Sequence, residues 1–167
     1  MEGNFSQGGK GYMDELKSYI TARLLKNPDY DLDELINEFC YGYYEEAAPF
    51  IIDYINLWED NISKYELWLY DDSDHPLFTD ELLQKAGNLL NNALKAVKDK
   101  KEIFKRVNLV FLTYYYTKIT RLPLSTEYRN EMIDDFIMQV RNQGITELFE
   151  RTALDYSIKI MKESQYC

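Results

Sequence analysis

The sequence has few of the residues on which most catalytic and metal-binding motifs depend. Its 167 residues include one histidine, two cysteines, four prolines and seven glycines. One histidine excludes most histidine-based catalysis and histidine-rich metal sites, and two cysteines do not form a disulfide framework. The sequence also lacks a glycine-rich phosphate loop, a nucleophile elbow and cysteine–histidine zinc spacing. We therefore expect no metal ion and no cofactor.

Long apolar runs and excess positive charge are also missing. No apolar run reaches the roughly 18 residues of a membrane-spanning helix. The N-terminus lacks the basic region and apolar core of a signal peptide. The net charge of −10 disfavours nucleic acid and anionic membranes as partners, because an acidic surface repels phosphate groups. Localisation stays open, since an internal piece of a secreted or periplasmic protein would lack the same signals.

Apolar residues are plentiful, and their spacing is helical. Hydrophobic residues make up 46% of the chain, and 15 tyrosines contribute to an aromatic content of 15%. A chain of this length buries about 70% of its unfolded surface without disulfides or metals. We predict an all-α fold, a bundle of about six to seven helices with short connections. Residues 12–167 form its single helical domain, and glycine-rich residues 1–11 form a flexible arm or the exit from a missing barrel.

The clearest helical pattern lies near the N-terminus, in residues 32–43. Its apolar positions recur every three or four residues: Leu32, Leu35, Ile36, Phe39, Cys40 and Tyr43. Asp31 is a suitable N-cap, and Gly42 is expected to end the helix. Asn27-Pro28 ends the preceding helix, and Pro49 suits the first turn of the next. This pattern predicts three neighbouring helices, in which Cys40 is a small buried side chain.

Four further helices follow in the remaining sequence. They are expected at residues 79–101, 102–121, 125–143 and 152–162. Thr79 or Asp80 caps the first of them and Ser125 or Thr126 the third, while residues 145–150 are extended or form a short turn. Gly87 marks either a close helix contact or a small loss of helix propensity. The helix at 102–121 is apolar on most sides, which predicts the innermost position.

Carboxylates are the one kind of catalytic group that the composition supplies in number. Three adjacent pairs occur: Glu45-Glu46, Glu59-Asp60 and Asp134-Asp135. Neighbouring residues on a helix point about 100° apart, so these pairs indicate solvated faces rather than a glycosidase pair. The segment from Asp71 to His75 lacks calcium-loop spacing and is interpreted as a solvated turn. A small enzyme with an unrecognised carboxylate pair is the least favoured hypothesis.

The N-terminal part resembles a known family through a specific set of residues. These are Glu2-Gly3-Asn4-Phe5, Gly8-Gly9, Glu15-Leu16, Tyr19, Leu24-Leu25, Asn27-Pro28, Phe39, Gly42-Tyr43-Tyr44, Ala47-Ala48-Pro49 and Tyr54. The run is similar to a bacterial family with a domain of unknown function, number 4838, in large glycoside-hydrolase-like proteins. There a similar run follows a TIM-barrel-like region and leads into a helical C-terminal part. The similarity covers roughly the first 60 residues, and afterwards only helical character and residues 144–147.

Two positions depart from the family pattern. Lys26 stands where the family has tryptophan after its leucine pair, and Glu45 stands where it has glycine after its tyrosine pair. A sugar or barrel contact made by that tryptophan would be missing here. The matching motifs are of a structural type and contain no catalytic signature.

The resemblance implies a non-catalytic helical C-terminal domain of a carbohydrate-active protein, packed on an upstream barrel and helping to shape its sugar site. Met1 directly precedes a motif that lies mid-chain in the family, so the chain is expected to be a piece of a longer protein. The residues expected to contact carbohydrate or the barrel are Glu2, Asn4, Phe5, Tyr43, Tyr44 and Trp58. Core packing is the competing interpretation of the aromatic residues. The alternative function is a stand-alone acidic helical bundle that binds a protein partner.

Overall fold

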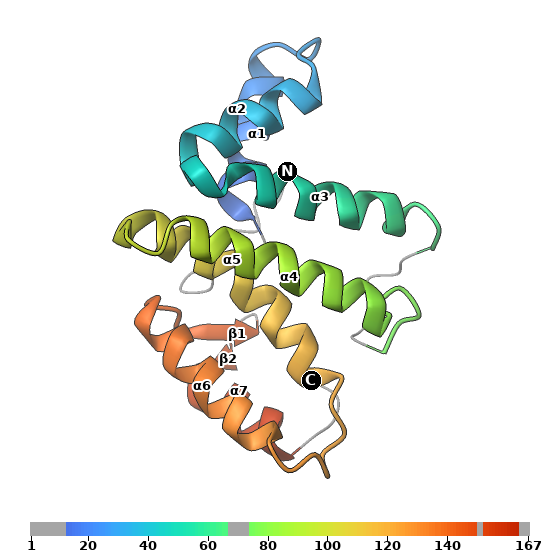
Figure 1. Ribbon diagram of the computed structural model, residues 1–167, viewed down its shortest axis with the longest axis vertical. Coiled ribbons are helices and arrows are strands. Elements are labelled where there is room, and N and C mark those ends of the chain that lie inside the picture. The colour runs from blue at the N-terminus through green and yellow to red at the C-terminus, as the bar shows by residue number, and fades with distance from the viewer. Residues whose placement is uncertain (1–12, 67–73, 150–151, 164–167) are drawn as a thin grey trace.

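The computed structural model describes residues 13–66, 74–149 and 152–163. Within these ranges the chain forms seven α-helices, one 3-10 turn and a two-stranded hairpin (Figure 1). The prediction of an all-α fold is confirmed. The expected arm at residues 1–11 lies outside the described residues.

The N-terminal helices begin and end largely where local chemistry predicts. Helix α1 (Asp14–Lys26) stops before Asn27, whose extended backbone suits the residue before a proline. Helix α2 (Leu32–Tyr44) is capped by Asp31, whose Oδ1 accepts a hydrogen bond from the Glu34 N–H at 2.9 Å. A 3-10 turn, η1 (Glu45–Ala47), then leads into α3 (Ala48–Ile62), which has proline in its first turn.

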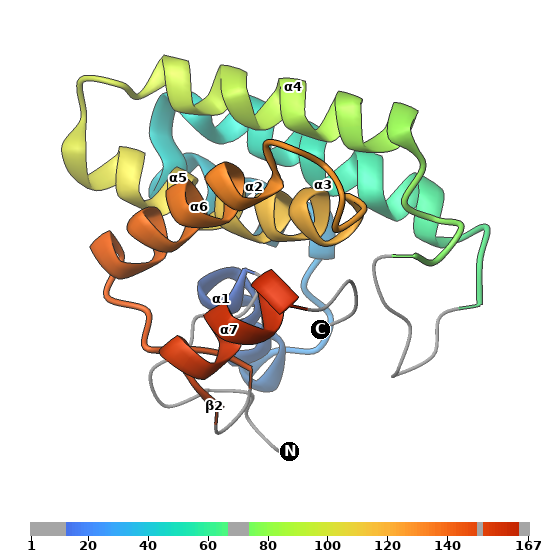
Figure 2. The ribbon, with the colours of Figure 1, turned by 90° about the horizontal axis from the view of Figure 1, so that it is seen from below.

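The central helices are long and antiparallel. Helix α4 (Asp80–Ala96) is capped by Thr79, whose Oγ1 accepts from the Leu82 N–H at 3.2 Å. Helix α5 (Lys101–Thr120) follows after a short connection. Figures 1 and 2 both show α3 and α4 running side by side, and they share an extensive contact.

The C-terminal part packs below α5 in the view of Figure 1. Helix α6 (Arg129–Asn142) ends in a Schellman motif, in which Gly144 has φ +72° and the Ile145 N–H donates to the Val140 carbonyl at 3.2 Å. Strands β1 (Glu147–Phe149) and β2 (Thr152–Ala153) pair antiparallel before α7 (Leu154–Glu163). The predicted stop at Gly144 is confirmed.

Two predictions about helix signals are wrong. Helix α2 continues through Gly42 to Tyr44, because Tyr43 and Tyr44 pack into the core and outweigh the weak helix propensity of the glycine. Helix α6 has no side-chain cap from Ser125 or Thr126. Turns that follow Pro123, with the Thr126 N–H donating to the Pro123 carbonyl at 2.9 Å, delay the helix to Arg129.

Three predicted helix boundaries also differ from the structure. The apolar spacing of residues 50–65 predicts that α3 reaches Tyr65, but the helix stops at Ile62. Helix α4 stops at Ala96 and not at residue 101, so the lysine-rich segment that follows is the connection to α5. Helix α7 begins at Leu154, because Thr152 and Ala153 pair as β2. Helix ends are weakly specified by sequence because the last turn has few hydrogen bonds of its own.

The buried side chains form two clusters that share α5. One cluster contains residues of all five helices from α1 through α5. The other contains residues of α5, α6, the β1–β2 hairpin and α7. Ile103, Val107, Val110 and Tyr114 of α5 enter the first cluster, whereas Leu109, Leu112 and Ile119 enter the second. The predicted innermost position of this helix is confirmed. Among the described helices, none has both the length and the hydropathy needed to cross a bilayer.

Candidate functional site

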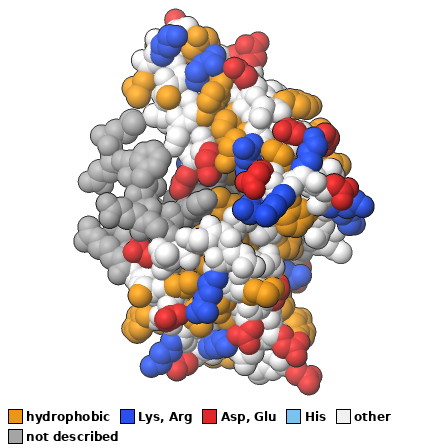
Figure 3. All heavy atoms as spheres, turned by 90° about the vertical axis from the view of Figure 1, so that its left-hand side faces the viewer, with side chains coloured by type: hydrophobic (Ala, Val, Ile, Leu, Met, Phe, Trp, Pro, Cys, Tyr) orange, Lys and Arg blue, Asp and Glu red, His pale blue; other side chains and the backbone are white. Residues whose placement is uncertain are grey.

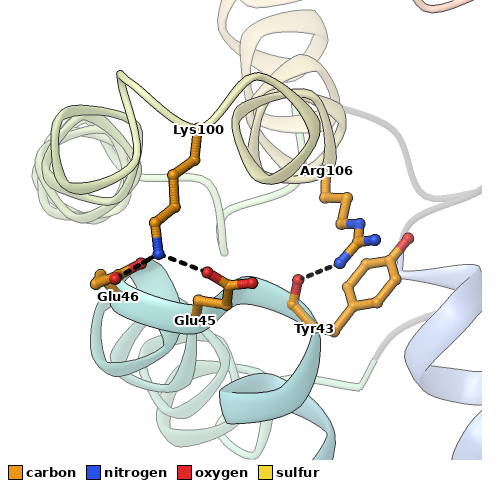
Figure 4. Close-up of polar contacts among 5 residues, drawn as sticks. All are labelled: Tyr43, Glu45, Glu46, Lys100 and Arg106. Carbon is orange, nitrogen blue, oxygen red and sulfur yellow. Dashed lines mark hydrogen bonds and ion pairs between the residues drawn. The ribbon is translucent and has the colours of Figure 1, made fainter.

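The junction between α2 and α3 holds two of the segments that carry the family resemblance, residues 42–44 and 47–49, and it contacts the connection that follows α4. Lys100, in the α4–α5 connection, places its Nζ 2.6 Å from Glu45 Oε2 and 2.7 Å from Glu46 Oε2 (Figure 4). These partners are more than 50 residues apart in the chain. The ion pairs therefore connect the N-terminal helices to the antiparallel pair of helices α4 and α5.

Arg106 of α5 makes a second connection to the same junction. Its Nη1 donates to the carbonyl oxygen of Tyr43 at 2.9 Å, and its guanidinium carbon lies 4.4 Å from the centre of the Tyr43 ring (Figure 4). The same ring stacks on Phe39 at 4.8 Å between centroids. Planar arginine is well suited to such a contact, because it can bind the ring and the carbonyl together.

The charges at this junction suit a structural ion pair better than proton transfer by Glu45 or Glu46. The hydrogen bond from Lys100 lowers the pKa of Glu46, and hydrogen bonds to Glu45 and then Glu46 raise the pKa of the Lys100 ammonium. Both carboxylates thus face one ammonium. A typical glycosidase needs two carboxyl groups on opposite sides of the scissile bond, one of them protonated as the general acid.

The two carboxylates of the Asp134-Asp135 pair bind different partners in the structure. Asp134 pairs with Lys162 of α7 at 2.6 Å, while Asp135 accepts from Gln139 Nε2 at 2.9 Å. Among the described residues, no three histidine, cysteine, aspartate or glutamate side chains gather as a metal site requires. Asp71 and Asp72 lie outside the described residues.

The predicted contact residues fall into separate environments. Tyr44 is 2% exposed and belongs to the first core cluster, and burial strongly raises its pKa. Tyr43 is half-buried beside it, with the two ring centroids 5.0 Å apart. Trp58 is half-buried in α3, edge-on to Tyr54 at 6.0 Å and to Phe78 at 5.7 Å. For Tyr44 and Trp58 this arrangement agrees with core packing, and their contact with carbohydrate or a barrel stays a prediction.

The remaining predicted contact residues are at the N-terminus. Glu2, Asn4 and Phe5 lie outside the described residues. Cys40 is fully buried, and burial raises the pKa of its thiol to about 12, as expected for a packed rather than a reactive cysteine.

Two surface grooves were not anticipated from the sequence. One lies between α4 and α5 and has a volume of about 380 Å³, and half of its lining residues have amide or cationic side chains. The other has a volume of about 460 Å³, lies between α4, α5 and α6, and is lined by Phe104, Phe111 and Met138 together with four amide side chains. In the sequence, the polar residues that line these grooves recur every three or four positions. Any solvated helix face has the same pattern, so the spacing alone does not predict a groove.

The charged surface mixes both signs over the face that contains the α4–α5 connection. Figure 3 shows acidic, basic and apolar side chains interspersed there, rather than one continuous field. This face therefore does not resemble the uniformly charged surfaces that bind polyanions or polycations.

The described fold defines an all-α helical protein whose N-terminal helices form a packed junction. A model of the family described as "Domain of unknown function (DUF4838)" matches residues 1–56. The match includes α1, α2, η1 and the first part of α3, and it ends inside that helix. It supports the resemblance to this family for the N-terminal third of the chain. The chain matches no curated protein and no solved structure.

Proposed function

We propose that this chain is a non-catalytic helical domain of a carbohydrate-active, glycoside-hydrolase-like protein. Its N-terminal helices pack on a barrel of that protein and help to shape the rim of the sugar site. The observation that carries the proposal is the packing of the family-like residues: Tyr44, Ala47 and Ala48 are buried in a helical junction, and burial raises the pKa of the Tyr44 phenol, which keeps it protonated. Residues of this kind support a neighbouring site rather than perform its chemistry.

The distribution of carboxylates supports a role without catalysis. Glu45 and Glu46 share Lys100, and Asp134 pairs with Lys162. Catalytic carboxylates, if the whole protein has them, belong on the barrel in this proposal. The isolated chain should therefore release no nitrophenol from a panel of aryl glycosides, and turnover that survives repurification would contradict the proposal.

The parent protein is tested by the genomic sequence directly upstream of Met1. The proposal expects an in-frame region with alternating strand and helix patterns, as in a barrel. An in-frame stop codon followed by a ribosome-binding site immediately before Met1 would contradict it. That outcome would support the alternative function.

The alternative is a stand-alone acidic helical module that binds another protein. It is favoured by apolar side chains that flank the α1–α2 connection, where Leu25 is 73% exposed and Leu32 is 48% exposed. A protein partner would remove such exposed apolar side chains from water. The same residues fit a barrel contact, so the upstream sequence, rather than this surface, distinguishes the two functions.

A further inference from the structure

The groove between α4 and α5 is built from two matching polar faces. Helix α4 contributes amide side chains and α5 contributes a phenol and two cations, each set spaced by three or four residues so that it lines one side of its helix. These six residues are Gln84, Asn88 and Asn91 on α4 and Tyr114, Lys118 and Arg121 on α5 and its C-cap. Because the helices are antiparallel, the N-terminal half of α4 faces the C-terminal half of α5 (Figure 1).

Gly87 determines the depth of this groove. A Cβ atom at this position would lie 2.8 Å from Cζ of Tyr114 and closer still to its hydroxyl oxygen. The absence of a side chain therefore lets the Tyr114 hydroxyl reach the backbone of α4. Tyr114 is 7% exposed, so it forms the floor of the groove while the amides form its rim.

The amide side chains on the rim are available for a ligand. Gln84 and Asn88 are exposed, as is Asn91, and none of the three forms a side-chain hydrogen bond with another described residue. Each amide presents two donors and one acceptor oxygen. Three such groups in a row can bind hydroxyl groups, which also both donate and accept.

The cations give the groove a charge opposite to that of the whole chain. The net charge of the protein is −10, yet the described residues that line the groove include two cations, Lys118 and Arg121, and one acid. That acid, Asp80, is fully exposed and lies 3.8 Å from Arg121 Nη2, whereas Lys118 has no ion-pair partner among the described residues. Cations at a helix C-terminus also offset the helix dipole, so their position alone does not indicate a ligand. The additional feature that does is the row of amides on α4, which lines the opposite side of the same groove.

From this arrangement we propose that the α4–α5 groove binds an acidic saccharide, a sugar with a carboxylate. Lys118 and Arg121 bind the carboxylate, and the amides of α4 bind the hydroxyl groups. Arginine suits a carboxylate because its guanidinium can donate two parallel hydrogen bonds. The groove volume of about 380 Å³ falls in the range of small-molecule sites. The choice of a sugar rests on the proposed function, while the choice of an acid rests on the groove itself.

The proposal is tested by isothermal titration of the full chain with three probes: digalacturonic acid, the neutral disaccharide galactobiose and inorganic sulfate. We expect digalacturonic acid to bind at least about tenfold more tightly than the other two, since charge-assisted and neutral hydrogen bonds would act together only on that probe. Galactobiose binding equally well would overturn the role of the cations. Sulfate binding equally well would show a general anion site and overturn the role of the amides.

Paired variants locate the binding. Lys118→Gln with Arg121→Gln should weaken digalacturonic acid binding at least about tenfold. Lys95→Gln with Lys98→Gln removes the same charge from exposed positions outside the groove and should leave the Kd unchanged. An equal loss in both variants would place the ligand elsewhere. No binding by any probe would overturn the groove as a site but would leave the proposed function standing, because that function is tested by the upstream sequence.

Discussion

At the scale of single residues, Glu45 has a backbone conformation that glycine adopts more easily. Its φ is +50° and its ψ is −120°, a region that side chains with a Cβ disfavour. The family resemblance leads us to expect glycine at this position, and the observed backbone conformation supplies a physical reason for that expectation. Here the ion pair with Lys100 offsets part of the strain.

Substitutions at Glu45 separate the backbone strain from the ion pair. Glu45→Gly and Glu45→Ala both remove the carboxylate, but only glycine relieves the strain. We expect the glycine variant to be more stable than the alanine variant by about 1 kcal/mol in urea unfolding. Equal midpoints for the two variants would show that position 45 carries no strain.

Gly87 offers a second comparison at this scale. Glycine to alanine within a helix usually stabilises it by up to about 1 kcal/mol. Gly42, which has no neighbouring atom within 4 Å, should follow this rule. Gly87→Ala should instead destabilise the protein by about 1–3 kcal/mol, because the new methyl group meets Tyr114.

The mechanism is checked by removing the atom that causes the clash. In a Tyr114→Phe background, which lacks the hydroxyl oxygen, the penalty of Gly87→Ala should shrink when thermal unfolding of the four proteins is compared. A penalty that stays the same in both backgrounds would place the cause elsewhere.

At the scale of elements, the start of α2 depends on one hydrogen bond from Asp31. Asp31→Ala leaves the Glu34 N–H without that acceptor, so unfolding by urea should show a loss of about 1 kcal/mol. Asp33→Ala removes the same charge from the first turn without removing the cap, and it should cost less. Equal losses would indicate a helix-dipole effect and not a cap.

At the scale of the whole molecule, α5 couples two core clusters. Ile51 is fully buried in the first cluster and Ile133 in the second. Both tryptophans, at positions 58 and 68, precede α4 in the chain. Tryptophan fluorescence therefore reports on the N-terminal half, whereas far-UV circular dichroism reports on all helices.

This arrangement predicts cooperative unfolding. Ile133→Ala should lower the free energy of unfolding by about 3 kcal/mol and shift the fluorescence and circular dichroism transitions together. Ile62→Ala, on an exposed side chain, should shift both very little. If Ile133→Ala shifts the midpoint of the circular dichroism transition but leaves the fluorescence midpoint unchanged, the two clusters unfold separately.

The sequence by itself determined most of the helices through local chemistry, and the apolar character of α5 also determined its central position. Apolar spacing located α2 and α5, Asn27-Pro28 ended α1, and Asp31 capped α2, because each signal acts within a few residues. The weaker signals at Gly42 and Ser125 were overridden by packing and by neighbouring turns.

Only the tertiary structure decided which distant side chains meet. Lys100 meets Glu45 and Glu46, and Gly87 admits Tyr114, because helix packing brings separate faces together. The same packing aligns the amides of α4 with the cations of α5 into one groove. The spacing of residues within one helix indicates which side chains share a face. Which face of a neighbouring helix packs against them depends on the distance and direction of that helix, and these follow from the tertiary packing.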